Sequence, residues 1–231
     1  MVQQGLNGNK NVKDGFTVVW AGYVTSFQGT AGSEYAKVNN LHGRGARAGD
    51  WCFMFSGYGN GVNAAGQVSG TGVSSWTAGN YTWMYDAAYS YTTLTQGDVT
   101  CNDMLRLTRV TDVVFLIILR ANFGSSLIGT LKSSFPNQYS GSSLTFPGFT
   151  KSKDSRGMFA LICDRDTTSI MGAPSGWRSY NSNSAGSAFT MWGIDLRNPS
   201  SYVDGSSIVV PIGAAQTYDQ TGMLFEMTSG Y

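Results

Sequence analysis

The sequence predicts an all-β protein, a jelly-roll-like β-sandwich built from two similar Greek-key halves. The first observation is composition: the 231 residues include 30 Gly, 12 Tyr, 12 Phe and 6 Trp, but only 13% are charged, against about a quarter in typical globular domains. Helical surfaces usually carry many Glu, Lys and Arg, and this chain has only two Glu, so helix should be scarce. The second observation is a series of short apolar runs between turn-rich loops, and the third is an internal repetition. A chain of this length fits one domain, residues 15–231.

The apolar runs predict strands in chain order. Residues 16–24 (FTVVWAGYV) form a lead-in strand. Asp50–Phe55 and Val113–Leu119 do not alternate between apolar and polar residues, which indicates central strands that are buried on both faces or flanked by other subunits. Thr82–Tyr89 does alternate, with aromatic and Ala side chains on one face, as in a half-buried antiparallel strand. We expect about eight strands or a few more in the whole chain.

Four segments recur in the same order, which predicts two halves at about residues 15–124 and 125–231. Each half reads as strand, polar loop ending in Trp, strand, second polar loop and strand, and residues 142–150 (SSLTFPGFT) lead into the second half. Two such halves indicate two Greek-key units of one jelly roll. The matched positions, 101 to 109 residues apart, are Phe55 with Ile162, Trp76 with Trp177, Tyr81 with Phe189, and Phe115 with Leu224.

The repeated Trp is interpreted as a structural plug at the start of a strand. Trp76 and Trp177 would each cap one end of the sandwich, and stacking on a ligand is the alternative. Residues 1–14 have no apolar periodicity, so they indicate either an N-terminal arm that docks on another subunit or a frayed end.

Charge and hydropathy argue against several classes of partner. The formal net charge of +1 and the pI near 7.6 offer no field for a polyanion, so nucleic-acid binding is not expected. The densest basic stretch, HGRGAR at residues 42–47, could contact a phosphate, but a solvated loop is the favoured interpretation. The longest apolar run has seven residues (113–119) where a membrane span needs roughly 20, so no span is expected. The N-terminus lacks the apolar segment of a secretion signal, so we expect the chain to stay in the cytoplasm where it is made.

The cysteines and the single histidine predict no metal centre and no nucleophilic triad. Cys52 and Cys163 lie in apolar runs, and with Cys101 they are expected to be reduced. Their spacings do not match zinc motifs. His42 lies in a Gly-rich loop, and the chain contains no G-x-S-x-G motif.

Acidic residues near strand ends give no firm catalytic or metal site. A glycoside hydrolase needs two opposed carboxylates, but the sequence cannot pair them and Asp is also a common turn residue. Asp164 and Asp166 weakly resemble a calcium loop, without the Gly and distal Glu of an EF-hand. HGRGARAGD at residues 42–50 is not a dinucleotide fingerprint. We therefore predict no enzyme, no catalytic, cofactor-binding or metal residue, and no cofactor. The candidate carboxylates are Asp50, Asp86, Asp164, Asp166 and Asp195.

The abundance of Tyr, Trp, Asn, Ser and Gly is typical of surfaces that recognise proteins or sugars. The alternative is that most aromatic side chains fill the sandwich.

Several motifs between residues 46 and 231 resemble small β-sandwich virion proteins of bacteriophages, of the marine or cyanobacterial type. They are RAGDWCFMFSGYGNG, GVSSWTAGN, VVFLIILRAN, GMFALICDRD and APSGWRSYN, and they contain an A-G-D before an apolar strand, a P-x-G-W turn and an apolar strand ending in Leu119-Arg120. The resemblance implies a virion structural protein, a capsid decoration or head-fibre protein, assembled in the host cytoplasm. Its expected partners are copies of itself, with a trimer as the expected homo-oligomer, and the major capsid or other virion proteins. The alternatives are a tail-fibre or receptor-binding module that recognises host surface glycans, and a free enzyme acting on cell-wall sugar.

Overall fold

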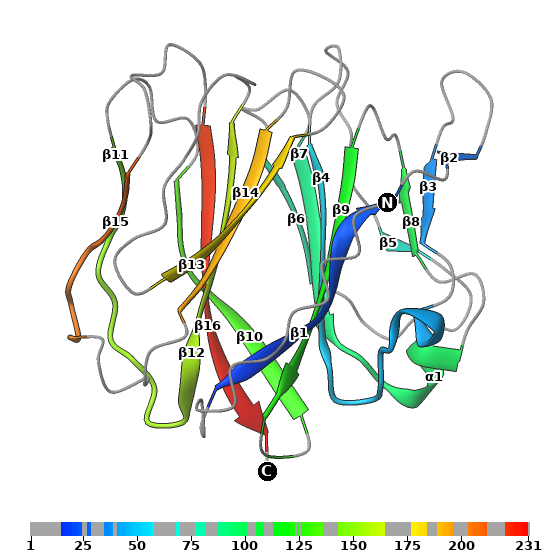
Figure 1. The fold of residues 1–231 in the computed structure, drawn as a ribbon, viewed down its shortest axis with the longest axis horizontal. Helices are drawn as coiled ribbons and strands as arrows, with labels where there is room; N and C mark the ends of the chain where they lie inside the picture. Colours follow the sequence, from blue (N-terminus) through cyan, green and yellow to red (C-terminus); the bar gives the residue numbers. More distant parts are fainter. Residues whose placement is uncertain are drawn as a thin grey trace. The chain divides into compact units, whose positions relative to one another are not determined.

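The structure is a computed structural model, and the prediction of an all-β protein with little helix is confirmed. The described residues contain sixteen strands, one short helix, α1 (Gln96–Thr100), and one 3-10 turn, η1 (His42–Arg44). The number of strands exceeds the expected eight or so because several short strands lie in stretches that the sequence predicts to be polar loops. The strand pairs in Figure 1 are antiparallel. The structure describes residues 15–24, 27–28, 35–38, 41–57, 68–69, 77–81, 87–100, 105–108, 113–122, 124, 126–135, 143–164, 177–183, 189–195, 203–211 and 220–230.

The chain divides into two compact units, each described here by itself. Unit 1 is Met1–Ile128 with Ser229–Tyr231, and unit 2 is Gly129–Thr228. Strands β10 and β16 therefore have residues in both units.

Unit 1 contains a five-stranded sheet and a four-stranded sheet. The five-stranded sheet has the order β1-β9-β4-β7-β6 and the four-stranded sheet the order β2-β3-β8-β5 (Figure 1). The predicted lead-in strand of residues 16–24 coincides with β1. The bounds are β1 (Phe16–Val24), β9 (Val113–Ala121), β4 (Trp51–Gly57), β7 (Ala87–Thr93) and β6 (Thr77–Tyr81), then β2 (Phe27–Gln28), β3 (Tyr35–Val38), β8 (Leu105–Thr108) and β5 (Val68–Ser69).

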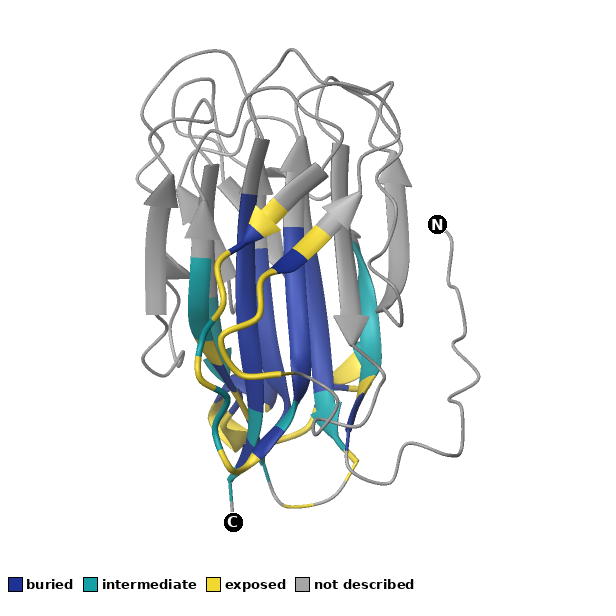
Figure 2. Ribbon diagram, turned by 90° about the vertical axis from the view of Figure 1, so that its left-hand side faces the viewer, coloured by how far each residue is buried: buried dark blue, intermediate teal, exposed yellow. Residues whose placement is uncertain are grey.

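The core of unit 1 follows two adjacent strands whose consecutive residues are all buried. Residues 51–54 of β4 and 116–119 of β9 are at most 1% exposed, and Figure 2 shows strands buried over several successive residues. Because successive side chains of a strand point to opposite faces, both faces of these strands are covered. For residues 51–54 and 116–119 of the two non-alternating runs, burial on both faces is confirmed. Each fully buried large apolar side chain contributes about 1.5–3 kcal/mol, and the rings of Trp51 and Phe53 stack with centroids 5.6 Å apart.

Unit 2 contains a second five-stranded sheet, with the order β10-β16-β12-β14-β13, and a two-stranded sheet of β11 and β15. Residues 157–161 and 222–227 are buried in succession, as in the central strands of unit 1. The rings of Phe159 and Phe225, from paired strands, have centroids 6.2 Å apart. The bounds are β10 (Ser126–Phe135), β16 (Gln220–Gly230), β12 (Ser155–Asp164), β14 (Phe189–Asp195), β13 (Trp177–Asn183), β11 (Ser143–Phe146) and β15 (Ile208–Pro211).

The two five-stranded sheets have the same strand order relative to the chain. Strands β10, β16, β12, β14 and β13 take the places of β1, β9, β4, β7 and β6, and the pair β11 with β15 takes the place of β3 with β8. In unit 1, Phe53 pairs with Ile117, and in unit 2, Ala160 pairs with Leu224. When β4 is matched to β12 at the predicted offset of 107 residues, the counterpart of Leu224 is therefore Ile117, and the predicted match with Phe115 is wrong by two residues. This correspondence supports the predicted repetition, while the domain count and a common origin of the halves stay predictions.

Two further details of the predicted alignment are wrong. The counterpart of the first lead-in strand is β10, whereas residues 142–150 supply β11, which ends at Phe146 just before Pro147. Pro lacks the N–H that a strand ladder needs, which explains why this run is shorter than predicted. Tyr81 ends β6 and Phe189 begins β14, the counterpart of β7, so these two residues are not equivalent.

Some predictions fall outside the described residues. They concern the arm (1–14), Trp76, and residues 82–86 of the alternating run, which is described only from Ala87 onward as part of β7. Trp177 begins β13, as predicted, but its side chain is not described. The plug role of the two Trp residues stays a prediction.

Candidate functional site

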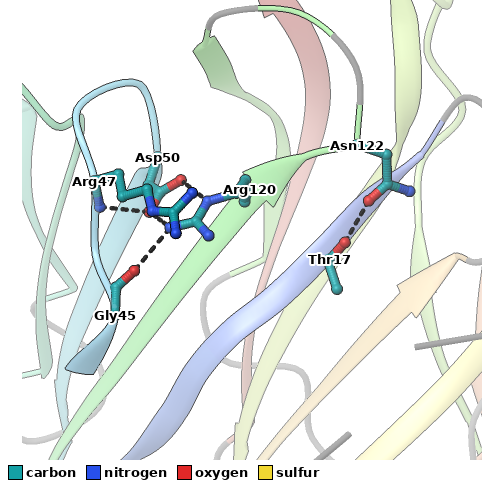
Figure 3. A network of polar contacts seen from close by, with 6 residues as sticks. All are labelled: Thr17, Gly45, Arg47, Asp50, Arg120 and Asn122. Atoms are coloured by element: carbon teal, nitrogen blue, oxygen red, sulfur yellow. Dashed lines mark hydrogen bonds and ion pairs between the residues drawn. The ribbon is translucent and has the colours of Figure 1, made fainter. Parts of the chain in front are cut away.

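The main polar site of unit 1 is a buried ion pair between the start of β4 and the end of β9 (Figure 3). Asp50 is 2% exposed. Its Oδ1 accepts a hydrogen bond from Nε of Arg120 at 2.7 Å, and its Oδ2 accepts one from Nη2 at 2.7 Å. The backbone N–H of Arg47 donates a third bond to Oδ2 at 2.8 Å. A bidentate Arg–carboxylate pair is both strong and directional, so it fixes the loop before β4 against the end of β9.

The basic loop at residues 41–47 is packed against β1. Leu41 and Ala46 are fully buried, and the guanidinium of Arg44 lies 5.0 Å from the ring centroid of Trp20, which is a cation–π contact. Burial lowers the pKa of Arg44 from its ordinary value. The prediction of a solvated loop therefore holds only for the exposed residues of this loop, such as His42. Sequence reading missed that Leu41 and Ala46 are buried and that Arg44 packs on Trp20.

Glycine allows the turn that brings this loop back to Arg120. Gly45 has φ +85°, in the left-handed region that favours glycine, and its carbonyl oxygen accepts a bond from Nη2 of Arg120 at 2.7 Å. One arginine thus holds both the turn and the carboxylate of Asp50. The ion pair joins two residues on which the family resemblance rests, the A-G-D aspartate and the strand-ending arginine.

The same end of unit 1 also holds the point where the chain leaves β9. The backbone N–H of Asn122 bonds to the carbonyl of Gly15, and Thr17 bonds to the side chain of Asn122 (Figure 3). Leu127 donates its N–H to the carbonyl of Gly49 at 2.7 Å and accepts a bond from the hydroxyl of Thr93 at 2.7 Å. The beginning of β10 is therefore anchored to the loop that carries Asp50.

Unit 2 has its own buried carboxylate, Glu226 in β16, which is fully buried. Its Oε1 accepts the N–H of Ser152 at 2.7 Å, and its Oε2 accepts the hydroxyl of Ser152 at 2.8 Å. The ammonium of Lys132 in β10 lies 2.9 Å from Oε2. Burial raises the pKa of Glu226, but the hydrogen bonds from Lys132 and Ser152 outweigh burial and leave the pKa below its ordinary value. Glu226 is therefore ionised at neutral pH.

Both carboxylates hold the loop that precedes the central strand of their own sheet. In unit 1 the loop supplies the acid and β9 the cation, whereas in unit 2 the acid is on β16 and the loop supplies Ser152. From the sequence, Asp50 is a candidate acid without an identifiable partner, and Glu226 is distinguished only as one of two glutamates. The only signal for Glu226 was a charged residue within an otherwise apolar run.

The paired carboxylates of a glycoside hydrolase are not found among the candidates that can be placed. Both oxygens of Asp50 are occupied by its structural bonds. Asp164 pairs with Phe189 at one end of β14, and Asp195 lies six residues along the same strand. This separation is about 20 Å at the usual strand rise, beyond the 5–9.5 Å or so that the reaction needs. Asp86 and Asp166 lie outside the described residues.

Cys52 is a free, fully buried cysteine at the second position of β4. Burial raises the pKa of its thiol strongly, and the negative charges of Asp98 and Asp50 add to the effect. The thiol therefore stays protonated and packs as a small apolar group, as predicted. The residue Cys101 and the side chain of Cys163 lie outside the described residues.

Within the part of the chain that the structure describes, no group of three or more His, Cys, Asp or Glu side chains could hold a metal ion. None of the described helices has the length and apolar character to cross a membrane.

No protein-family model matches the chain, and no curated protein or solved structure matches it either. The interpretation of the site therefore rests on its own geometry. In each unit a buried carboxylate has its oxygens taken up by bonds to a cation and to a loop. The arrangement fixes loops to a sheet.

Proposed function

We propose that the chain is a bacteriophage virion structural protein, a capsid decoration or head-fibre protein that acts by binding and assembly. The observation that carries the proposal is the strand order shared by the two five-stranded sheets. Numbered along the chain, the eight strands of a jelly roll form one sheet in the order 1-8-3-6 and another in the order 2-7-4-5. Jelly rolls are a common architecture of viral capsid proteins.

Unit 1 fits this scheme when its two-residue strand β2 is set aside. The order β1-β9-β4-β7 corresponds to 1-8-3-6, and β3-β8-β5 corresponds to 2-7-4. The fifth strand in this count, β6, lies beside β7. In unit 2, β10-β16-β12-β14 corresponds to 1-8-3-6, and β11 with β15 to 2-7. We therefore infer that each half is a jelly roll of its own, rather than half of one jelly roll.

The polar sites support a role in assembly. Both buried carboxylates hold loops in place, and rigid loops lose little entropy when they contact a neighbour. The proposed partners are copies of this chain, as a trimer, and the major capsid or another virion protein, with residues 1–14 as the attachment arm. The proposed location is the virion, after assembly in the host cytoplasm.

A receptor-binding module for host surface glycans is the second candidate. It is favoured by the wealth of Tyr, Asn, Ser and Gly in the sequence and by the use of jelly rolls as lectins. In this case the chain would lie at the tip of a tail fibre.

Antibody labelling of purified phage particles tests the proposal. Labels spread over the head in many copies support a decoration or head-fibre protein, and labels confined to the tail tip support the receptor-binding candidate. A chain lacking residues 1–14 keeps the whole of β1, which begins at Phe16. This truncated chain should fold but bind particles poorly. Particles that carry no label contradict both candidates.

A further inference from the structure

Two loops of unit 2 form a rigid exposed surface, which we call the two-loop surface. It consists of residues 147–154, between β11 and β12, and residues 203–207, before β15, together with Val209. Figure 2 shows both loops as largely exposed stretches that continue from short strands.

Three sets of contacts hold these loops in place. The N–H of Lys151 donates to Oδ1 of Asp204 at 2.9 Å, and the N–H of Gly205 donates to the carbonyl of Phe149 at 3.1 Å. A Cβ atom added to Gly148 would lie 1.9 Å from the carbonyl oxygen of Gly205, so the two backbones are in close contact. The bonds of Ser152 to Glu226, described above, tie the first loop to the sheet. The surface is therefore preorganised for binding.

The chemistry of the two-loop surface is apolar at its centre and charged around it. Val203 is 70% exposed and Val209 is 49% exposed, and they are two of the three large apolar side chains exposed in the described part of the chain. Pro147 is exposed as well. The loops carry two positive and two negative residues, so their charges balance. These residues are Lys151, Lys153, Asp154 and Asp204.

We propose that the two-loop surface binds the same surface of a second copy of this chain. The inference rests on the self-association in the proposed function and names a surface through which neighbouring oligomers would contact one another. A two-fold axis near Val203 would place the first loop of one copy against the second loop of the other, with Lys153 facing Asp204. A balanced surface of this kind is complementary to itself, as an isologous contact requires. The net charge of +1 leaves little repulsion between copies.

The size of the surface predicts a weak contact that many copies reinforce. Two short loops and three apolar side chains fall short of the roughly 800 Å² per partner of a stable complex. On a particle, where copies are held close together, weak contacts add through avidity. A two-fold contact can link neighbouring oligomers, so it does not replace the proposed trimer contact.

Analytical ultracentrifugation of the full chain over a range of concentrations, together with site-specific crosslinking, tests the proposal. Val203→Lys introduces repelling charges on both copies and should weaken self-association by at least about tenfold. Because Val203 is largely exposed, the variant should keep the melting temperature of the wild type, and Val203→Ser provides a milder second variant. The matched control is Ile128→Lys, which changes an exposed apolar residue of unit 1 and should leave self-association unchanged.

Crosslinking locates the contact. In Val203→Cys, a short bismaleimide should join position 203 of two copies, as mass spectrometry of the linked peptides would show. The control Gln96→Cys places a thiol at the exposed first residue of helix α1 and should give no such link.

Each outcome decides a separate point. If the wild type and Val203→Lys self-associate equally well, the inference is wrong and the proposed function stands. The same holds if Gln96→Cys forms crosslinks and Val203→Cys does not. If Val203→Lys loses particle binding without a change in self-association, the partner is another virion protein and the inference is again wrong. If the wild type neither associates nor crosslinks at any concentration, the inference fails, while particle labelling still decides the proposed function.

Discussion

Replacement of Arg120 by Met should destabilise the protein by about 3 kcal/mol. The change removes two short charge-assisted hydrogen bonds to Asp50 and one bond to the carbonyl of Gly45. It leaves a carboxylate that is 2% exposed with one backbone N–H. Breaking a buried ion pair by removing one partner usually costs about 3–5 kcal/mol. The side chain of Arg120 is 32% exposed, so water can partly solvate Asp50 in the variant, and we expect the lower end of this range.

Thermal and urea unfolding measure the loss of stability, and hydrogen exchange locates it. For a chain of this length the loss corresponds to a decrease in melting temperature of roughly 6–12 °C. Exchange should accelerate in β4 and β9. The matched control is Arg47→Met, because Arg47 is exposed and contacts Asp50 only through its backbone N–H among the bonds described above. The substitution should therefore change the unfolding free energy by no more than about 0.5 kcal/mol. A loss below about 1 kcal/mol for Arg120→Met, or equal losses for both variants, would refute the anchoring role.

Three further predictions follow from the buried groups and the loop contact. The folded state holds the pKa of Glu226 below its ordinary value of about 4.3, so the stabilisation from ionised Glu226 is present at neutral pH and is lost as the pH falls below about 4. The difference in unfolding free energy between the wild type and Glu226→Gln should therefore shrink as the pH falls through this range. The exposed control Asp154→Asn should differ little from the wild type. Cys52 should resist alkylation in the native protein and react in denaturant, and rapid native labelling would contradict its burial. Gly148→Ala should lower the melting temperature because its Cβ meets the carbonyl of Gly205; if the temperature is unchanged, the loops are not in close contact.

Strands could be predicted where burial leaves a pattern in the sequence. The strands β4 and β9 were recognisable because a central strand covered on both faces consists of consecutive apolar residues, as the buried residues 51–54 and 116–119 show. Strand β10 was missed because, among residues 126–133, only Leu127 and Gly129 are buried, along a run of small and polar residues. Short strands such as β11 carry too few residues for any period to show.

The polar sites were harder to predict because their partners are far apart in the chain. Asp50 and Arg120 are separated by 70 residues, and only the pairing of β4 with β9 brings them together. Ser152 and Glu226 are separated by 74 residues. A sequence shows the kinds of side chain at strand ends, whereas the contacts between them depend on which strands are neighbours in the sheet.

We propose that this chain is a structural component of the outer surface of a phage head, and an image reconstruction of purified particles, at a resolution that separates β-sheets, is the decisive experiment. We expect density for two five-stranded sheets with the strand orders described here, repeated symmetrically over the head, with the chain's N-terminal residues directed at the particle. Density for this chain only at the tail tip would contradict the head location. Its absence from the particles altogether would contradict a virion role.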